Sequence, residues 1–123
     1  MKICITSKGD TIDSEIDPRF GRCMYFIVYD VDTGESKAFD NENRDGSGGV
    51  GIKSAEFMAS QGVRAVLTGN VGPNAFETLK SAGIKIYTGM SGKVKDAVSS
   101  FKAGNLNYTS GPTVNTKQNK QTR

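Results

Sequence analysis

The sequence contains no histidine, and this absence narrows the chemistry that the protein can perform. It excludes Ser–His–Asp triads, histidine general bases and zinc sites built on imidazole. No other general base of suitable pKa is apparent, so we expect a binding protein and not an enzyme. Cysteine is also scarce, since Cys4 and Cys23 are the only two. Two thiols cannot complete a four-thiolate cluster site in one chain, so a bound cluster must be held incompletely, through non-protein ligands, or by a dimer.

Long hydrophobic runs are missing as well. No stretch approaches the roughly 20 apolar residues of a membrane span. The first residues also lack the hydrophobic region of a signal peptide. We therefore expect a cytoplasmic protein with no membrane partner. The 123 residues, 36% of them hydrophobic, suffice for one domain with a core of its own.

The net charge of +3 comes from one end of the chain. The sequence has 16 basic and 13 acidic residues, and its last fifteen residues hold Lys117, Lys120 and Arg123 but no acid. Residues 1–108 therefore carry 13 charges of each sign. Nucleic-acid-binding domains carry positive charge on a folded face, so no nucleic-acid partner is expected. The sequence predicts one domain over 1–108 and a disordered, polar and basic tail over 109–123.

Hydrophobic patterns predict five strands and three helices. The strands are expected at 2–7, 23–31, 35–40, 63–68 and 84–87. The helices are expected after the glycine-rich loop 41–51, from Pro73, and after Ser91, and each ends near a glycine. The order βββαβαβα predicts an α/β domain with a five-stranded mixed sheet flanked by helices.

The same order predicts where a site would lie. Right-handed crossovers make the first, fourth and fifth strands parallel, and a hairpin returns the third strand in the same direction. Their carboxyl ends then share one edge of the sheet, where ligands of open α/β sheets bind. Helix N-termini near Val50 and Pro73 point free N–H groups to that edge, which favours an anion. The loops expected to converge there are 8–22, 41–51, 69–73 and 88–92.

The stretch Asp17-Pro18-Arg19-Phe20-Gly21-Arg22-Cys23 lies in this region and concentrates functional groups. It holds two guanidiniums and one thiol within seven residues, directly before the strand-like run 25–29. Cationic side chains lower the pKa of a nearby thiol, and arginine presents a planar fork of donors to an anion. The stretch therefore predicts a thiolate-plus-anion site.

Three separated motifs resemble one known family. They are the stretch 14–23, the glycine-rich loop 46–51, and Gly69-Asn70-Val71-Gly72-Pro73-Asn74-Ala75 followed by Gly83-Ile84-Lys85. Over about residues 1–106 the chain resembles the dinitrogenase iron–molybdenum cofactor biosynthesis family, in particular its small stand-alone members. The resemblance implies a ribonuclease H-like fold and a nitrogenase-accessory type of carrier protein. Such a protein binds an anionic iron–sulfur or molybdenum–iron–sulfur cluster without catalysing a reaction. Some accessory members use a histidine for the cluster, and this chain has none.

The motifs and their expected place at the sheet edge give ten candidate cofactor-binding residues. Cys23 is also the candidate metal ligand. No nucleotide is expected, because the glycine-rich loop matches neither the P-loop nor the dinucleotide fingerprint. The ten candidates are Arg19, Phe20, Gly21, Arg22, Cys23, Gly48, Gly49, Gly69, Asn70 and Gly72.

Each candidate also has a purely structural interpretation. Cys23 could pack as a buried apolar residue, as we expect for Cys4 in the middle of the first strand. The glycine-rich loop could be a plain connection, and 69–73 an ordinary βα turn. The two arginines of the motif could form surface ion pairs with a nearby acid, namely Asp10, Asp13 or Asp17.

Two functions of different classes remain open. The first is a carrier of an anionic metal–sulfur cluster, with cluster donor and acceptor proteins as partners, acting as a monomer or weak homodimer. The second is a small-molecule- or phosphate-binding regulatory or interaction module of the same fold without metal. Nuclease activity is not expected. Its two-metal chemistry needs clustered carboxylates, and the first strand offers Cys4 and Thr6 in their place.

Overall fold

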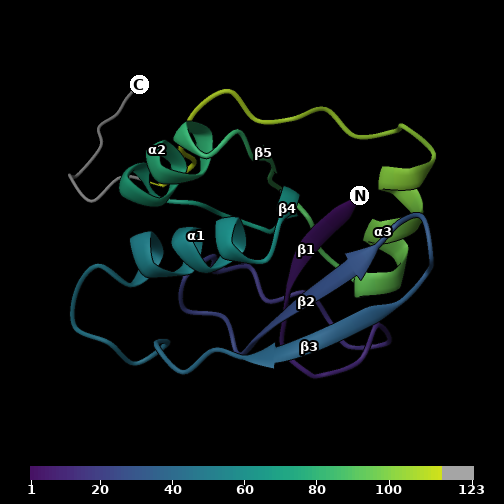
Figure 1. Cartoon of the computed structure of the whole chain (residues 1–123), viewed down its shortest axis with the longest axis horizontal. Helices are drawn as coiled ribbons and strands as arrows, with labels where there is room; N and C mark the ends of the chain where they lie inside the picture. Colours follow the sequence, from purple (N-terminus) through teal and green to yellow (C-terminus); the bar gives the residue numbers. More distant parts are fainter. Residues whose placement is uncertain (115–123) are drawn as a thin grey trace.

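The computed structural model describes residues 1–114 and shows one mixed sheet of five strands with three helices (Figure 1). The predicted order βββαβαβα is confirmed, and the arrangement is compatible with the ribonuclease H-like fold that the resemblance implied. The helices are α1 (Val50–Ser60), α2 (Pro73–Ser81) and α3 (Val94–Lys102). The strands are β1 (Lys2–Ser7), β2 (Tyr25–Asp30), β3 (Ser36–Asp40), β4 (Val63–Leu67) and β5 (Lys85–Tyr87).

The strands lie in the order β3-β2-β1-β4-β5 across the sheet. β1 is parallel to β4, and β4 is parallel to β5, whereas β2 is antiparallel to both β1 and β3. The carboxyl ends of β1, β3, β4 and β5 therefore share one edge, together with the start of β2. This arrangement confirms the predicted topology and determines which loops can form a site.

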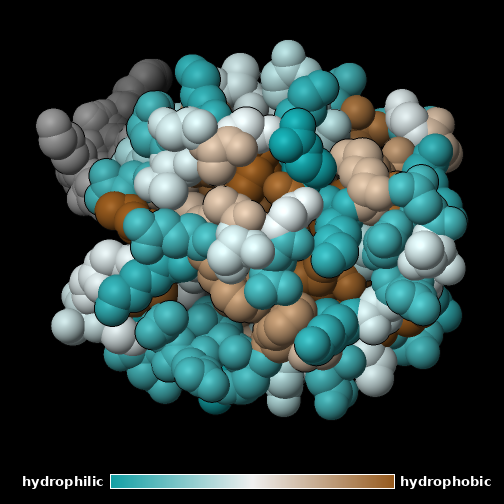
Figure 2. All heavy atoms as spheres, viewed as in Figure 1, coloured by the Kyte–Doolittle hydropathy of each residue, from teal (hydrophilic) through white to brown (hydrophobic). Residues whose placement is uncertain are grey.

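Alternate residues of β1 point to opposite sides of the sheet and divide the core in two. On one side, Cys4 lies in a buried cluster with side chains of α1 and α2, including Met58 and Leu79. On the other side, Ile3 lies in a cluster with Val94 and further side chains of α3. The protein thus has three layers, and Cys4 is fully buried as predicted. On the face seen in Figure 2, many hydrophobic residues show in the middle, a few show near the left and upper right margins, and hydrophilic residues cover much of the rest.

Contacts of neighbouring loops move two of the predicted boundaries. The second strand begins at Tyr25 and not at Cys23, because β1 ends opposite Tyr25 and the preceding N–H donates to the carboxylate of Asp17. Helix α3 begins at Val94 and not beside Ser91, because the two residues between them pair with the chain at 15–16. Across residues 1–114, no helix is both long and apolar enough to cross a membrane.

The chain after α3 stays attached to the body beyond residue 108. Residues 105–114, which we call the strap, pass the β5 edge and run toward the N-terminus of α2 (Figure 1). The N–H of Thr109 donates to the carbonyl of Ile86 at 2.6 Å, and the N–H of Thr113 donates to the carbonyl of Val71 at 2.9 Å. Residues 109–114 of the predicted tail thus form hydrogen bonds to the body, with partners that composition does not reveal. Residues 115–123 of the predicted tail lie outside the described residues.

We expect Gly69→Ala to destabilise the protein by about 1–3 kcal/mol, the usual range for overpacking. A Cβ atom at residue 69 would lie 2.7 Å from the Cα atom of Pro18 and 2.9 Å from its carbonyl oxygen. Gly48→Ala is the matched control, because a Cβ atom there has no neighbour within 4 Å. Urea denaturation measures the free energy of unfolding of each protein. Equal values for the two variants would contradict the close contact between residues 18 and 69.

Candidate functional site

A cleft of about 410 Å³ opens at the predicted edge of the sheet. Three segments line it: the loop 19–22 before β2, the N-terminus of α1, and the turn 70–75 into α2. Val114, at the end of the strap, supplies a further wall. The structure therefore brings parts of all three sequence motifs together. Six of the ten predicted site residues line the cleft, namely Arg19, Phe20, Gly21, Arg22, Asn70 and Gly72.

Small residues let the three segments approach one another closely. A Cβ atom on Gly21 would lie 3.1 Å from the Cα atom of Gly51, the second residue of α1. A Cβ atom on Gly51 would in turn lie 3.0 Å from the Cβ atom of Ala75 in α2. Gly21 also has a φ of +99°, which side chains of L-residues rarely permit. The first turns of α1 and α2 thus meet each other and the loop 19–22.

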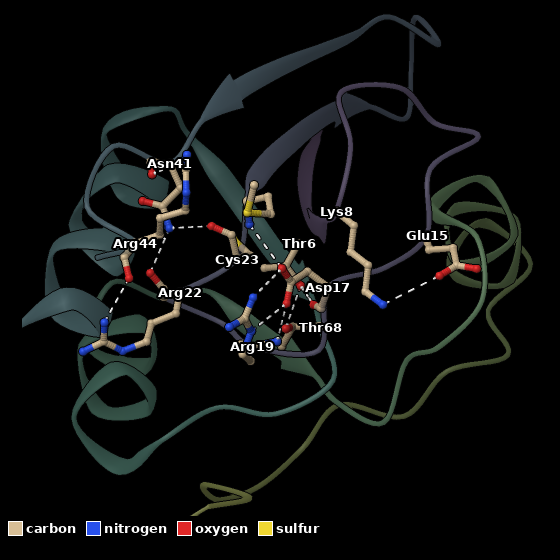
Figure 3. Close-up of polar contacts among 12 residues, drawn as sticks. Thr6, Lys8, Glu15, Asp17, Arg19, Arg22, Cys23, Asn41, Arg44 and Thr68 are labelled. Carbon is tan, nitrogen blue, oxygen red and sulfur yellow. Dashed lines mark hydrogen bonds and ion pairs between the residues drawn. The ribbon is translucent and has the colours of Figure 1, made fainter. Parts of the chain in front are cut away.

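The buried carboxylate of Asp17 fixes the shape of this loop (Figure 3). It is 1% exposed and accepts hydrogen bonds from the N–H, Nε and Nη2 of Arg19 and from the N–H of Met24. The carbonyl of Asp17 accepts a 2.6 Å hydrogen bond from Thr6 Oγ1 in β1, and the same hydroxyl oxygen lies within hydrogen-bond distance, 2.8 Å, of Thr68 Oγ1 after β4. The loop is therefore tied to the carboxyl ends of two adjacent strands.

Asn41, the residue after β3, holds the other end of the loop. Its Nδ2 donates to the carbonyl oxygens of Gly21 at 2.8 Å and Cys23 at 2.9 Å, and its N–H donates to the carbonyl of Met24. Asn41 is buried, so loss of these bonds would leave polar groups without water. Asn41 was not among the ten candidate residues. An asparagine between a strand and a glycine-rich loop is nevertheless a signal for such side-chain-to-backbone bonding.

The two arginines of the motif have different environments. Arg19 forms an ion pair with Asp17, with 3.2 Å between Nε and Oδ1, and this contact raises the pKa of Arg19 above its usual value. Arg19 thus forms an ion pair with one of the three acids considered, although that acid is buried and not at the surface. Arg22 is exposed and donates from Nη1 to the carbonyl oxygen of Arg44 at 2.9 Å. Within residues 1–114 it has no carboxylate partner, so its positive charge is available to a ligand in the cleft.

Helices α1 and α2 both present uncapped N-termini to the cleft. Their N-cap residues are Gly49 and Gly72, and neither helix has a side-chain cap or an acidic residue in its first turn. The helical bonds begin with Lys53 N–H to the Gly49 carbonyl and Phe76 N–H to the Gly72 carbonyl. The N–H groups before them remain for a ligand or water. They form the positive ends of two helix dipoles, which favour an anion.

Cys23 does not line the cleft. Its side chain is fully buried in the same apolar cluster as Phe20 and Phe26. The pKa of the Cys23 thiol is raised to about 12. Burial is the larger cause, and the negative charge of Asp17 is the second. The expected lowering of this pKa is therefore wrong, because the guanidinium of Arg19 faces Asp17 and burial outweighs the remaining positive charge.

Throughout residues 1–114, no group of three or more Cys, Asp or Glu side chains could hold a metal ion. Cys23 as a metal ligand stays a prediction, and it would require the loop to open.

Comparison with known proteins identifies the family of the chain. The family described as dinitrogenase iron-molybdenum cofactor matches residues 1–104. This chain belongs to that family. The resemblance drawn from the three sequence motifs is therefore confirmed.

Two solved structures and one further protein illustrate the likeness of this family member to its relatives. The orange protein from Desulfovibrio gigas, solved in its apo form, has 38% sequence identity and a TM-score of 0.89, with 92% of this chain and 96% of that chain covered. A Thermotoga protein named for NifB has 38% identity and a TM-score of 0.76, with coverages of 87% and 91%. An uncharacterized protein of Methanocaldococcus jannaschii is 33% identical over 97 residues, which are 76% of this chain and 82% of the relative.

Four of the ten candidate residues of this dinitrogenase cofactor family member lie outside the cleft lining. Gly48 and Gly49 are exposed in the loop before α1, Gly69 is buried against Pro18, and Cys23 is in the core. Most of the other lining residues belong to the quoted motifs and lie at the predicted helix starts, but they were not among the ten candidates. Val114 lies in the predicted tail, where no contact with the body was expected. The missed residues are Val50, Gly51, Pro73, Asn74, Ala75 and Val114.

We expect Asn41→Ala to destabilise the protein by about 2–3 kcal/mol, because two buried carbonyl oxygens lose their donor. Asn43→Ala is the matched control, since Asn43 is exposed and its backbone N–H, not its side chain, bonds Asn41 Oδ1. Thermal and urea denaturation of both variants provide the measurement. A loss of stability in Asn41→Ala no larger than in the control would show that Asn41 does not hold the loop.

We expect the stability of the wild type to fall above about pH 9 more steeply than that of a Cys23→Ala variant. In the unfolded chain the thiol ionises near its ordinary pKa of 9.0, whereas in the folded protein its pKa is about 12. Between these values the unfolded state binds fewer protons, so rising pH favours unfolding. The difference in slope is on the order of 1 kcal/mol per pH unit. Urea denaturation at several pH values measures it, and parallel curves would contradict a buried, neutral thiol.

Proposed function

We propose that this protein binds and carries an anionic metal–sulfur cluster, either an iron–sulfur cluster or one that also contains molybdenum, and that it catalyses no reaction itself. The observation that carries this proposal is the convergence of two uncapped helix N-termini and the unpaired charge of Arg22 around one cleft. Membership of the dinitrogenase iron-molybdenum cofactor family supports a metal–sulfur cargo over other anions.

The chemistry of the cleft lining suits a bulky anion. Its volume of about 410 Å³ falls in the usual range for small-molecule sites. The positive potential comes from backbone N–H groups and arginine, and apolar groups make up much of the remaining surface. A cluster with sulfide on its outside is large and polarisable, so it can contact both kinds of surface at once. The apolar groups come from Phe20, Val50, Pro73, Ala75 and Val114.

One relative supports a bound group of this kind. The Desulfovibrio gigas protein is named for its orange colour and was solved in its apo form. Protein side chains do not absorb visible light, so colour in a protein points to a bound chromophore. Metal–sulfur clusters absorb in the visible region. We extend this to the present chain as part of the proposal, on the basis of 38% identity over nearly the whole relative.

The residues of the cleft take distinct roles in this proposal. Arg22 supplies the charge, while Arg19 contributes less because Asp17 already pairs with it. The N–H groups at the starts of α1 and α2 donate to the cargo, and the side chain of Asn70 lies where it can do the same. Gly48 and Gly49 give access to the α1 N-terminus, and Gly69 positions the turn before Asn70. Cys23 would ligate iron only after the loop 20–24 opens.

The test is anaerobic loading with tetrathiomolybdate and, separately, with a preformed iron–sulfur cluster, followed by metal and sulfide analysis. We expect wild type to retain stoichiometric metal. Arg22→Gln should bind about tenfold more weakly, the effect of one charge-assisted hydrogen bond. Arg64→Gln is the matched control, because Arg64 is exposed near the amino end of β4, away from the cleft. Cys23→Ala should retain its metal.

The other outcomes separate the alternatives. Loss of metal in Cys23→Ala alone, with the fold intact, would identify Cys23 as the anchor. Equal binding by Arg22→Gln and Arg64→Gln would move the site away from the cleft. If the wild type retains neither cluster, the carrier proposal is contradicted. Binding of inorganic phosphate in its place would then favour the regulatory module without metal. Gel filtration of the loaded protein would test the expected monomer or weak homodimer.

A further inference from the structure

Beyond Tyr108, the strap is hydrogen-bonded to the body at two points on its way to the cleft. At the first point, the N–H of Thr109 donates to the carbonyl of Ile86 in β5, and the hydroxyls of Thr109 and Thr88 lie 2.6 Å apart. At the second point, Thr113 meets Val71. Between these points a hollow of about 360 Å³ separates the strap from α2 and β5, with Phe76, Lys80, Ile84, Tyr108 and Ser110 among its lining residues. Hydrogen bonds at two points therefore hold residues 109–114, whereas earlier in the strap Leu106 packs against the core and Lys85 lies over the ring of Tyr108.

The second point is a reciprocal pair of hydrogen bonds. The N–H of Thr113 donates to the Val71 carbonyl at 2.9 Å, and the N–H of Val71 donates to Thr113 Oγ1 at 2.9 Å. Val71 is buried and directly precedes Gly72, the N-cap of α2. The strap is thus bonded to the same turn whose N–H groups face the cleft.

Val114 extends this contact into a wall of the cleft. It belongs to the lining, and its Cγ2 lies 3.8 Å from the position that a Cβ atom on Gly72 would take. Val114 is nevertheless 47% exposed and belongs to neither core cluster. Val114 therefore shields one side of the α2 N-terminus from water, although its side chain does not take part in the packing of the core.

We propose that the strap is a retaining wall for the cargo, and that its docking at Val71 is coupled to occupation of the cleft. This inference rests on the proposed function. A docked strap excludes water near the α2 N–H groups, and their attraction for an anion is stronger in a medium of lower dielectric constant. Coupling between two binding equilibria is reciprocal, so cargo in the cleft strengthens the docking of the strap. Undocking of the second point then opens a route for release.

Four variants test the inference, with tetrathiomolybdate as the probe and its release rate as the first measurement. Thr113→Val removes the hydroxyl that accepts from Val71 but keeps the shape of the side chain. We expect release about fivefold faster, the effect of one neutral hydrogen bond. Thr33→Val is the matched control, because its hydroxyl accepts from Glu35 in the exposed turn between β2 and β3. Truncation after Gly111 removes the second point, and truncation after Val114 keeps it. Truncation after Gly111 should accelerate release by tenfold or more, and truncation after Val114 should not change the release rate.

Hydrogen exchange of the Thr113 amide is the second measurement, since a merely structural strap would show no response to cargo. We expect loading to slow exchange of this amide in the wild type. The inference would be overturned if both Thr113→Val and the Gly111 truncation released the probe at the wild-type rate. It would also be overturned if loading did not change exchange of the Thr113 amide. Either result would leave the carrier proposal intact. Equal acceleration by both truncations would assign retention to residues beyond 114 and also overturn it. If wild type takes up no tetrathiomolybdate or iron–sulfur cluster, the proposed function fails and this inference fails with it.

Discussion

The hydrogen bonds to the buried carboxylate of Asp17 are the interaction on which the rest of the site depends. A carboxylate without partners would be costly to bury, and here Arg19 and two backbone N–H groups satisfy it. Three consequences follow from this contact. It fixes the loop before β2 over the ends of β1 and β4, it offsets the charge of Arg19, and it opposes ionisation of Cys23. An acid within the basic motif thus determines which of the motif's groups can meet a ligand.

The cleft owes its charge to the backbone as much as to side chains. Strand order places the starts of α1 and α2 at the same edge, and the contact of Gly51 with Ala75 brings them together. A side chain at residue 51, or a larger one at residue 75, would separate the two helices and widen the cleft. Residues 1–108 have no net charge, so the attraction for an anion is local and does not extend far into solution. In the proposed carrier, selection of the cargo would then depend on contact within the cleft more than on long-range steering.

A carrier must hold its cargo and later give it up. With the Cys23 thiol buried away from the cleft, the N–H groups, the arginine and the apolar surface of the lining would hold a cluster without a bond from protein to metal. Release would then not require a ligand exchange at the metal. Val114 is exposed and the end of the strap has few contacts, so a weakly held part of the structure lies beside the cleft. Stability is lowest where segments have few buried contacts, and a carrier can use such a segment for exchange of cargo.

The sequence by itself determined the order of the elements, the edge of the sheet that forms the site, and the motifs that meet there. These follow from local patterns: hydrophobic periodicity, glycine and proline punctuation, and the handedness of crossovers. Only the tertiary structure decided the environment of each group. Cys23 and Arg19 were expected to form one thiolate-and-anion site, yet burial separates them, because burial and ion pairing depend on neighbours distant in the chain. Asn41 and Val114 joined the site through contacts with residues about 20 and 40 positions away, for which local sequence carries no periodic signal.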